Sequence, residues 1–152
     1  MEEPFTFLDP GKLTDDELEL ILIKTVPAND KLNYIPVYEF EMRNSKTSEK
    51  MGYIHFRVGY NENIKYGGHI GYGVDEKFRG KKYALRSLKL LFPFAKKHKI
   101  NPLWTTCNPE NAPSRKTCEL AGGKLVEIID IPKHNDCYHR GERKKCRYRF
   151  DI

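Results

Sequence analysis

The residues best placed to do chemistry in this sequence lie between Val74 and Ala84, where a glycine-rich stretch meets a basic segment with helical periodicity. Unpaired main-chain N–H groups and the positive end of the helix dipole make such a helix start an anion site. Gly80 lets the main chain approach a phosphate closely, and small Ala84 allows tight packing. Taken alone, the segment is equally compatible with a solvated basic helix start. As a binding site, it predicts diphosphate contacts from Arg79, Gly80, Lys81, Lys82, Tyr83 and Ala84.

Asn111 and Ser114 lie three residues apart on the turn after a predicted buried strand. An asparagine at this point is most often a helix N-cap, and that role is compatible with a binding role. The following segment, Ser114 to Val126, contains a predicted helix, a Gly-Gly stop and the start of a strand. The fixed spacing between this segment and the first makes a chance combination improbable.

Together the two segments resemble the GNAT superfamily of acyl-CoA-dependent N-acetyltransferases. Arg79 and Ala84 fit the ends of that family's cofactor motif, Gln/Arg-x-x-Gly-x-Gly/Ala, and Asn111 and Ser114 match its later asparagine and small residue. The middle glycine of the motif falls at Lys82, where we expect a lysine in helical dihedrals to offer its amide. The resemblance covers roughly residues 37 to 152.

The resemblance implies a reaction in which an amine attacks the thioester of acetyl-CoA directly. A base takes the proton of the amine, and an acid protonates the leaving thiolate. Main-chain groups of Tyr72, Gly73 and Val74 are expected to pair with pantetheine and to polarise the thioester carbonyl. Acetyl-CoA is thus the expected co-substrate, an unidentified primary amine is the acceptor, and no metal is required.

The acid and the base are less well defined than the cofactor site. Family members often carry a tyrosine acid seven residues after the motif asparagine, and here that position is Cys118. A thiol can protonate a thiolate, although a cysteine on such a helix is more often a core residue. Glu41 and His69 are the candidate bases because they lie on strands expected to flank the thioester. The alternatives are an outward polar position for Glu41, a structural imidazole for His69, and deprotonation through water.

The formal charge of +6 indicates an anionic partner, and the basic residues cluster at 77–86, 96–99 and 140–149. The last cluster alternates with aromatic residues, a pattern that suits RNA, although a turn and an exposed strand face explain it more simply. Tyr138 and Arg140 are alternatively expected to border the acceptor pocket. The favoured function is therefore an N-acetyltransferase. The alternatives are a non-catalytic acyl-CoA-binding or sensor protein on the same fold, and a basic nucleic-acid-binding domain.

Hydrophobic periodicity supplies the elements that must position these residues. Polar–apolar alternation and apolar runs predict strands at 17–25, 37–42, 53–58, 67–74, 102–107, 124–131 and 145–152, with a short helix competing at the first. Helical spacing predicts helices at 81–99, which Pro93 should kink or end, and at 112–121, closed by Gly122 and Gly123. This order predicts an α/β (α+β) fold with one GNAT-type mixed, mostly antiparallel sheet flanked by helices.

Length and composition limit the remaining choices. A chain of 152 residues with 39% hydrophobic and 32% charged residues predicts one domain over 1–152, with residues 1–33 a variant or shortened amino-terminal part. No apolar run approaches the roughly 20 residues of a membrane span, and the start Met-Glu-Glu-Pro lacks a basic signal, which predicts a cytoplasmic protein. The four cysteines contain no CxxC pair and should be reduced thiols, and a zinc site from Cys137, His139 and Cys146 matches no usual spacing. A homodimer is compatible with the sequence.

Overall fold

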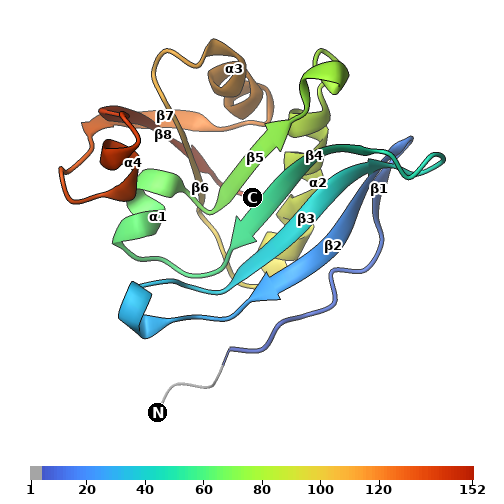
Figure 1. The fold of residues 1–152 in the computed structure, drawn as a ribbon, viewed down its shortest axis with the longest axis horizontal. Helices are drawn as coiled ribbons and strands as arrows, with labels where there is room; N and C mark the ends of the chain where they lie inside the picture. Colours follow the sequence, from blue (N-terminus) through green and yellow to red (C-terminus); the bar gives the residue numbers. More distant parts are fainter. Residues whose placement is uncertain (1–4) are drawn as a thin grey trace.

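The computed structural model describes residues 5–152, so the acidic start at residues 1–4 lies outside the described part. Figure 1 shows two antiparallel sheets with helices packed against them. The larger sheet has the order β1-β2-β3-β4-β5, with strands Leu13–Asp15, Leu18–Val26, Val37–Asn44, Lys50–Arg57 and Ile70–Val74. The smaller sheet has the order β6-β8-β7, with strands Leu103–Cys107, Lys124–Asp130 and Lys144–Phe150. The helices are α1 (Glu62–Gly67), α2 (Tyr83–Lys97), α3 (Ala112–Leu120) and α4 (Asp136–His139), and the short 3-10 turns are η1 (Asp30–Leu32) and η2 (Glu76–Phe78).

Strict alternation along β3 builds one wall of the core. Tyr38, Phe40 and Met42 are buried, whereas Glu39 and Glu41 point to the opposite face of the sheet. Because successive side chains of a strand alternate between faces, this pattern fixes the register against β4. Helix α2 covers the buried face with an apolar stripe that includes Leu88, Leu91, Phe94 and Ala95.

Helix α2 continues through Pro93, so the expectation that the helix ends there is wrong. Proline leaves the carbonyl of Lys89 without its helical partner. Both Lys89 and Pro93 lie on the exposed side of the helix, where water can bond that carbonyl, while Leu91 and Phe94 remain buried on either side. The apolar stripe therefore keeps the helix continuous on its core side.

The two sheets meet at the amino ends of β5 and β6, and the prediction of one sheet is corrected because the strands form two. There the N–H of His69 donates to the carbonyl of Trp104 at 2.8 Å, and the N–H of Trp104 donates to Nδ1 of the His69 ring at 3.0 Å. Beyond this junction the strands separate, and β6 pairs with β8 instead. The separation leaves one edge of β5 free of a neighbouring strand.

The amino-terminal segment forms strands and not the competing short helix: β2 occupies Leu18–Val26 and pairs with β3. Between them the chain has only η1 and loops, and this connection is tied to α1 because Asn61 and Asn63 both donate to the carbonyl of Asn33. Helix α1 lies between the strands predicted at 53–58 and 67–74, where the sequence predicted no helix. Among residues 5–152, no helix is long and apolar enough to cross a membrane.

Candidate active site

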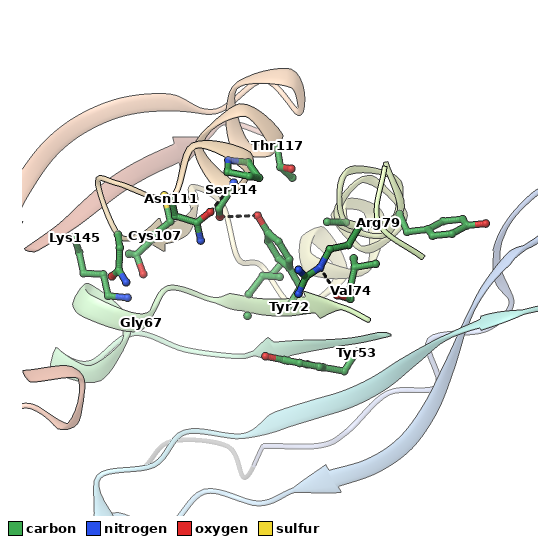
Figure 2. Close-up of a pocket in the computed structure, with 18 of the residues that line it drawn as sticks. Tyr53, Gly67, Tyr72, Val74, Arg79, Cys107, Asn111, Ser114, Thr117 and Lys145 are labelled. Carbon is green, nitrogen blue, oxygen red and sulfur yellow. Dashed lines mark hydrogen bonds between the residues drawn. The ribbon is translucent and has the colours of Figure 1, made fainter. Parts of the chain in front are cut away.

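A cavity of about 870 Å³ fills the space where β5 and β6 separate, and we call it the cleft. Figure 2 shows its lining: β5 on one side, α3 on the other, and the turn before α2 at its mouth. Every residue predicted to bind the cofactor lines this cleft except Lys81. The structure therefore brings together the two sequence segments that carried the family resemblance.

The turn before α2 owes its shape to two residues with positive φ. Gly80 has a φ of 89°, and Lys82, the residue that caps α2, has φ 61° and ψ 29°. Lys82 is therefore left-handed, and the prediction of helical dihedrals at this position is wrong. Glycine tolerates this conformation best, which explains why the family motif carries glycine where this chain has lysine.

Replacing Lys82 with glycine is expected to raise the free energy of unfolding by roughly 0.5–1 kcal/mol, because it removes the left-handed strain at the cost of some backbone entropy. Replacing the neighbouring Lys81 with glycine should instead lower the free energy of unfolding by about 0.5 kcal/mol, because Lys81 has no positive φ. Urea unfolding of the two variants measures both changes. Equal effects of the two substitutions would contradict the strain at Lys82.

The basic cluster at 77–86 divides into structural and cleft-facing cations. Arg86 forms ion pairs with Asp15 at 2.7 Å and Glu17 at 2.6 Å, and so joins α2 to the amino-terminal strands. These pairs raise the pKa of Arg86 against the opposing effect of burial. Of the remaining residues, Arg79 is exposed at the mouth of the cleft, where its Nε donates to the carbonyl of Val74 at 3.1 Å.

The opposite wall of the cleft is the first turn of α3. The side chain of Asn111 accepts a hydrogen bond from the N–H of Ser114 at 3.2 Å, so its expected N-cap role is confirmed. The hydroxyl of Ser114 lies 2.9 Å from that of Tyr72, which reaches across from β5 (Figure 2). Burial is the main cause that raises the pKa of Tyr72, so its hydroxyl stays protonated at neutral pH.

The free edge of β5 offers main-chain polar groups to the cleft. The N–H of Asp75 donates to the carbonyl of Met51, and the N–H of Arg57 donates to the carbonyl of His69. These two bonds show which residues of β5 turn their main-chain groups toward β4. Because bonded pairs alternate along an antiparallel ladder, Ile70, Tyr72 and Val74 turn their N–H and C=O groups away from β4. An extended ligand in the cleft can therefore pair with this edge as another strand would.

The three predicted catalytic residues, Glu41, His69 and Cys118, do not line the cleft. Glu41 lies on the outward face of β3 and holds Arg43 at 2.8 Å. Cys118 is buried on the inner side of α3, 3.1 Å from the hydroxyl of Thr105. The geometry thus favours the structural alternatives stated for Glu41 and Cys118.

His69 is also a structural residue by its contacts. Its ring is 2% exposed, Nδ1 accepts from the N–H of Trp104, and Nε2 lies 2.8 Å from the carbonyl of Gly59, to which it must donate. Burial lowers its pKa from 6.5 to about 4. A neutral imidazole with both nitrogens occupied has no free lone pair for a substrate proton.

Sequence reasoning missed several residues of the cleft, among them Tyr53 and Arg57 of β4. The signal that could have found them is the glycine spacing of β5, because glycines inside a strand often mark a close approach. A Cβ on Gly73 would lie 2.7 Å from the Tyr53 ring, and one on Gly71 would lie 3.0 Å from Nη2 of Arg57. These glycines thus make room for neighbouring side chains. The other missed lining residues are Ile70, Gly67, Phe78, Thr106, Cys107, Asn108, Pro113, Thr117, Cys137, Glu142 and Lys145.

Of the two residues expected to border an acceptor pocket, Arg140 lines the cleft and Tyr138 does not. Tyr138 instead packs its ring against the guanidinium of Arg143. Within the part of the chain that the structure describes, no group of three or more His, Cys, Asp or Glu side chains is placed to hold a metal ion.

Comparisons with known proteins agree with this geometry. Residues 2–124 match a family model described as an acetyltransferase (GNAT) domain. A search of curated proteins gives no match. Among solved structures, a GNAT-family acetyltransferase from Bacillus anthracis is 23% identical with a TM-score of 0.59; the alignment covers 74% of this chain but 65% of that one, slightly under two thirds of its length.

Two further structures align over nearly their whole length. The ribosomal-protein-S5-alanine acetyltransferase from Vibrio fischeri is 14% identical, with a TM-score of 0.69 and coverage of 92% of this chain and 96% of that one. A ribosomal L7/L12 alpha-N-protein acetyltransferase in complex with coenzyme A is 15% identical, with a TM-score of 0.67 and coverage of 93% and 98%. At these identities the similarity shows the shared fold.

The family model covers well over half of the chain, and it therefore decides the class of protein. It confirms the predicted GNAT acetyltransferase family, and the sheet topology confirms the predicted α+β fold, with antiparallel sheets flanked by helices. The chain belongs to the GNAT acetyltransferase family.

Proposed function

We propose that this protein transfers an acetyl group from acetyl-CoA, bound in the cleft, to a primary amine. One observation carries the assignment of the cofactor to the cleft: the amino terminus of α2 and the free edge of β5 open into the same cavity. The first suits a pyrophosphate and the second suits an extended pantetheine arm. Acetyl-CoA contains both groups, joined in that order.

In the bound state, Arg79 and the amides after Gly80 hold the pyrophosphate, and Tyr72 to Val74 pair with pantetheine. The N–H of a cleft-facing β5 residue, such as Tyr72, would polarise the thioester carbonyl as negative charge develops on its oxygen. The amine nitrogen attacks the carbonyl carbon, the carbon–sulfur bond breaks, and CoA leaves as a thiolate.

The hydroxyl of Tyr72 would stabilise that thiolate in place of the tyrosine that the family carries at the position of Cys118. Its hydrogen bond to Ser114 sets it against α3, one turn before Cys118. Because its pKa is raised, Tyr72 acts by donating a hydrogen bond to the leaving sulfur, and the full proton comes from solvent.

The nucleic-acid alternative loses support because most basic residues of the carboxyl-terminal cluster already pair with carboxylates. Lys145 lies 2.8 Å from Glu142, Arg149 lies 3.0 Å from Asp151, and Arg147 bonds Glu127 and stacks on Trp104. Paired cations contribute little to counterion release on a nucleic acid. Cytoplasmic location, a homodimer, and residues 1–33 as a shortened amino-terminal part stay predictions of the sequence.

Isothermal calorimetry with acetyl-CoA tests the cofactor assignment. Replacing Arg79 with Gln should weaken the Kd roughly tenfold, since it removes a charged hydrogen-bond donor worth about 1.5 kcal/mol. Lys77→Gln is the matched control, because Lys77 pairs with Glu49 at 3.2 Å and does not line the cleft. Absence of binding, or equal Kd values for Arg79→Gln and the wild type, would refute the assignment. Release of the CoA thiol in the presence of amines distinguishes the two functions: an enzyme releases it, whereas a non-catalytic acyl-CoA sensor binds acetyl-CoA without releasing it.

A further inference from the structure

A second cavity, of about 350 Å³, adjoins the cleft. Arg57, Gly67, Cys137 and Arg140 line both cavities, so the two lie side by side at these residues. Arg57 and Gly67 lie at the amino end of β5, whereas the turn from Arg79 to Ala84 follows its carboxyl end. A cofactor with its pyrophosphate at that turn therefore directs its thioester toward the second cavity.

The wall of the second cavity carries a histidine and a carboxylate on neighbouring strands. Glu39 of β3 stands opposite His55 of β4, and the two side chains approach to 3.6 Å between Oε1 and Nε2. Each side chain is 30% exposed, so both remain accessible to a small molecule. His55 also stands opposite Gly71 of β5, which places it beside the strand that holds the thioester.

The environment of His55 keeps it ready to accept a proton. Burial is the main cause that lowers its pKa below 6.5, Glu39 opposes this shift, and Arg57 adds to it. His55 is thus neutral at pH 7, and the carboxylate of Glu39 stabilises the imidazolium that forms when the ring takes a proton. The other charged or titratable groups around it are Tyr53, whose ring is tilted by 48° against the His55 ring, and Tyr34, Asp136, Cys137 and Arg140 on the cavity wall.

Arg57 supplies a fixed cation in the same cavity. Its Nη1 donates to the carbonyls of Gly67 at 3.2 Å and Gly68 at 3.0 Å, which holds the guanidinium in place. No other acceptor among residues 5–152 bonds this guanidinium, and no carboxylate there forms an ion pair with it. A guanidinium that is positioned but not neutralised favours a carboxylate partner.

From this arrangement we infer that the second cavity is the acceptor site, that His55 is the base, and that the acceptor is a primary amine carrying a carboxylate for Arg57. His55 and Arg57 are two residues apart on β4, so their Cα atoms lie roughly 6.6 Å apart. This separation suits an acceptor whose carboxylate is roughly three to five bonds from its amine nitrogen. A free γ-amino acid and the amino terminus of an acidic peptide both provide this chemistry. The inference rests on the proposed function.

In the reaction, the ring of His55 takes one proton from the amine as its nitrogen attacks the thioester carbon. The carbon–nitrogen bond forms, the carbon–sulfur bond breaks, and the thiolate of CoA takes a proton from solvent. Glu39 acts as a positioning residue because it contacts His55 and not the reacting atoms. The products are an amide, which keeps the carboxylate, and free CoA.

Thiol release from acetyl-CoA with two matched pairs of amines tests the acceptor class. The first pair is 4-aminobutyrate and 4-aminobutyramide, and the second is aspartyl-alanine amide and asparaginyl-alanine amide. In at least one pair, the compound with the carboxylate should have a KM roughly tenfold lower than the compound with the amide, because the carboxylate forms charged hydrogen bonds to Arg57. The pair that shows this difference identifies the source as a free amino acid or a peptide. Equal KM values within both pairs overturn the inference.

His55→Gln tests the base, and His134→Gln is its matched control because His134 also pairs with a carboxylate, Glu62 at 2.7 Å, but lines neither cavity. His55→Gln should lower kcat about a hundredfold and remove the rise of kcat/KM with pH near the His55 pKa, while acetyl-CoA still binds. An unchanged kcat and pH profile in a variant that binds acetyl-CoA overturns the assignment. Failure of the wild type to bind acetyl-CoA would instead refute the proposed function.

Discussion

Replacing Tyr72 with phenylalanine should lower kcat about a hundredfold with little change in the KM for acetyl-CoA. The substitution keeps the ring that lines the cleft and removes only the hydroxyl that reaches α3 at Ser114. A donor that acts on the leaving thiolate contributes in the transition state and not in the ground state, so the loss appears in kcat. Steady-state kinetics with saturating amine measures it.

Tyr138→Phe is the control for this experiment, because Tyr138 lies outside both cavities and packs against Arg143. It should leave kcat unchanged. Cys118→Ser gives a second comparison, since Cys118 is the residue at the family's tyrosine position but is buried behind the cleft. If kcat falls more for Cys118→Ser than for Tyr72→Phe while both variants stay folded, Tyr72 does not assist the leaving group.

Acidification should destabilise the protein through His69. The pKa of this ring is about 4 when folded against 6.5 when unfolded, so the unfolded chain binds a proton first as the pH falls. The stability contributed by neutral His69 is therefore complete above pH 6.5 and is lost as the pH falls toward 4. Between about pH 7.5 and about pH 4.5 the loss is roughly 2.5 kcal/mol.

The hydrogen bonds of His69 oppose protonation of its ring in the folded state. In the folded state Nδ1 accepts the N–H of Trp104, and a protonated ring would direct a second donor at that N–H. His69→Gln removes this titration, so its free energy of unfolding should fall less between the two pH values than that of the wild type. Urea unfolding at both values gives the difference. Identical pH dependence in the two proteins would show that His69 does not titrate as described.

The cofactor side of the site was predictable because its signals are local. Gly80, Ala84, Asn111 and Ser114 each act through the backbone of their own turn or helix, and residues near in sequence stay near in space. Lys82 shows the limit of that reasoning. Its departure from the family motif was visible in the sequence, but its left-handed conformation depends on how the whole turn enters α2.

Of the proposed acceptor side, only Arg140 was named from the sequence, because its other residues meet only through pairing between distant strands. Glu39 and His55 face each other because the register of β3 against β4 puts them in one row, and α4 adds Arg140 from the far end of the chain. The strand alternation at Glu39 and Glu41 predicted an outward face correctly, but not that this face borders a cavity. The loop between β2 and β3 encloses it together with α1 and α4.

By itself, then, the sequence determined the family, most of the longer strands and helices, and the turn from Val74 to Ala84 at which a pyrophosphate is expected. The period of the hydrophobic residues and the positions of the glycines are local signals, so each can be recognised from a short stretch of sequence. The tertiary structure alone decided that His69 joins the two sheets, that Tyr72 reaches α3, and that His55 borders a second cavity. Burial, register and the direction of a side chain depend on partners far along the chain, and they decide which histidine is free to take a proton.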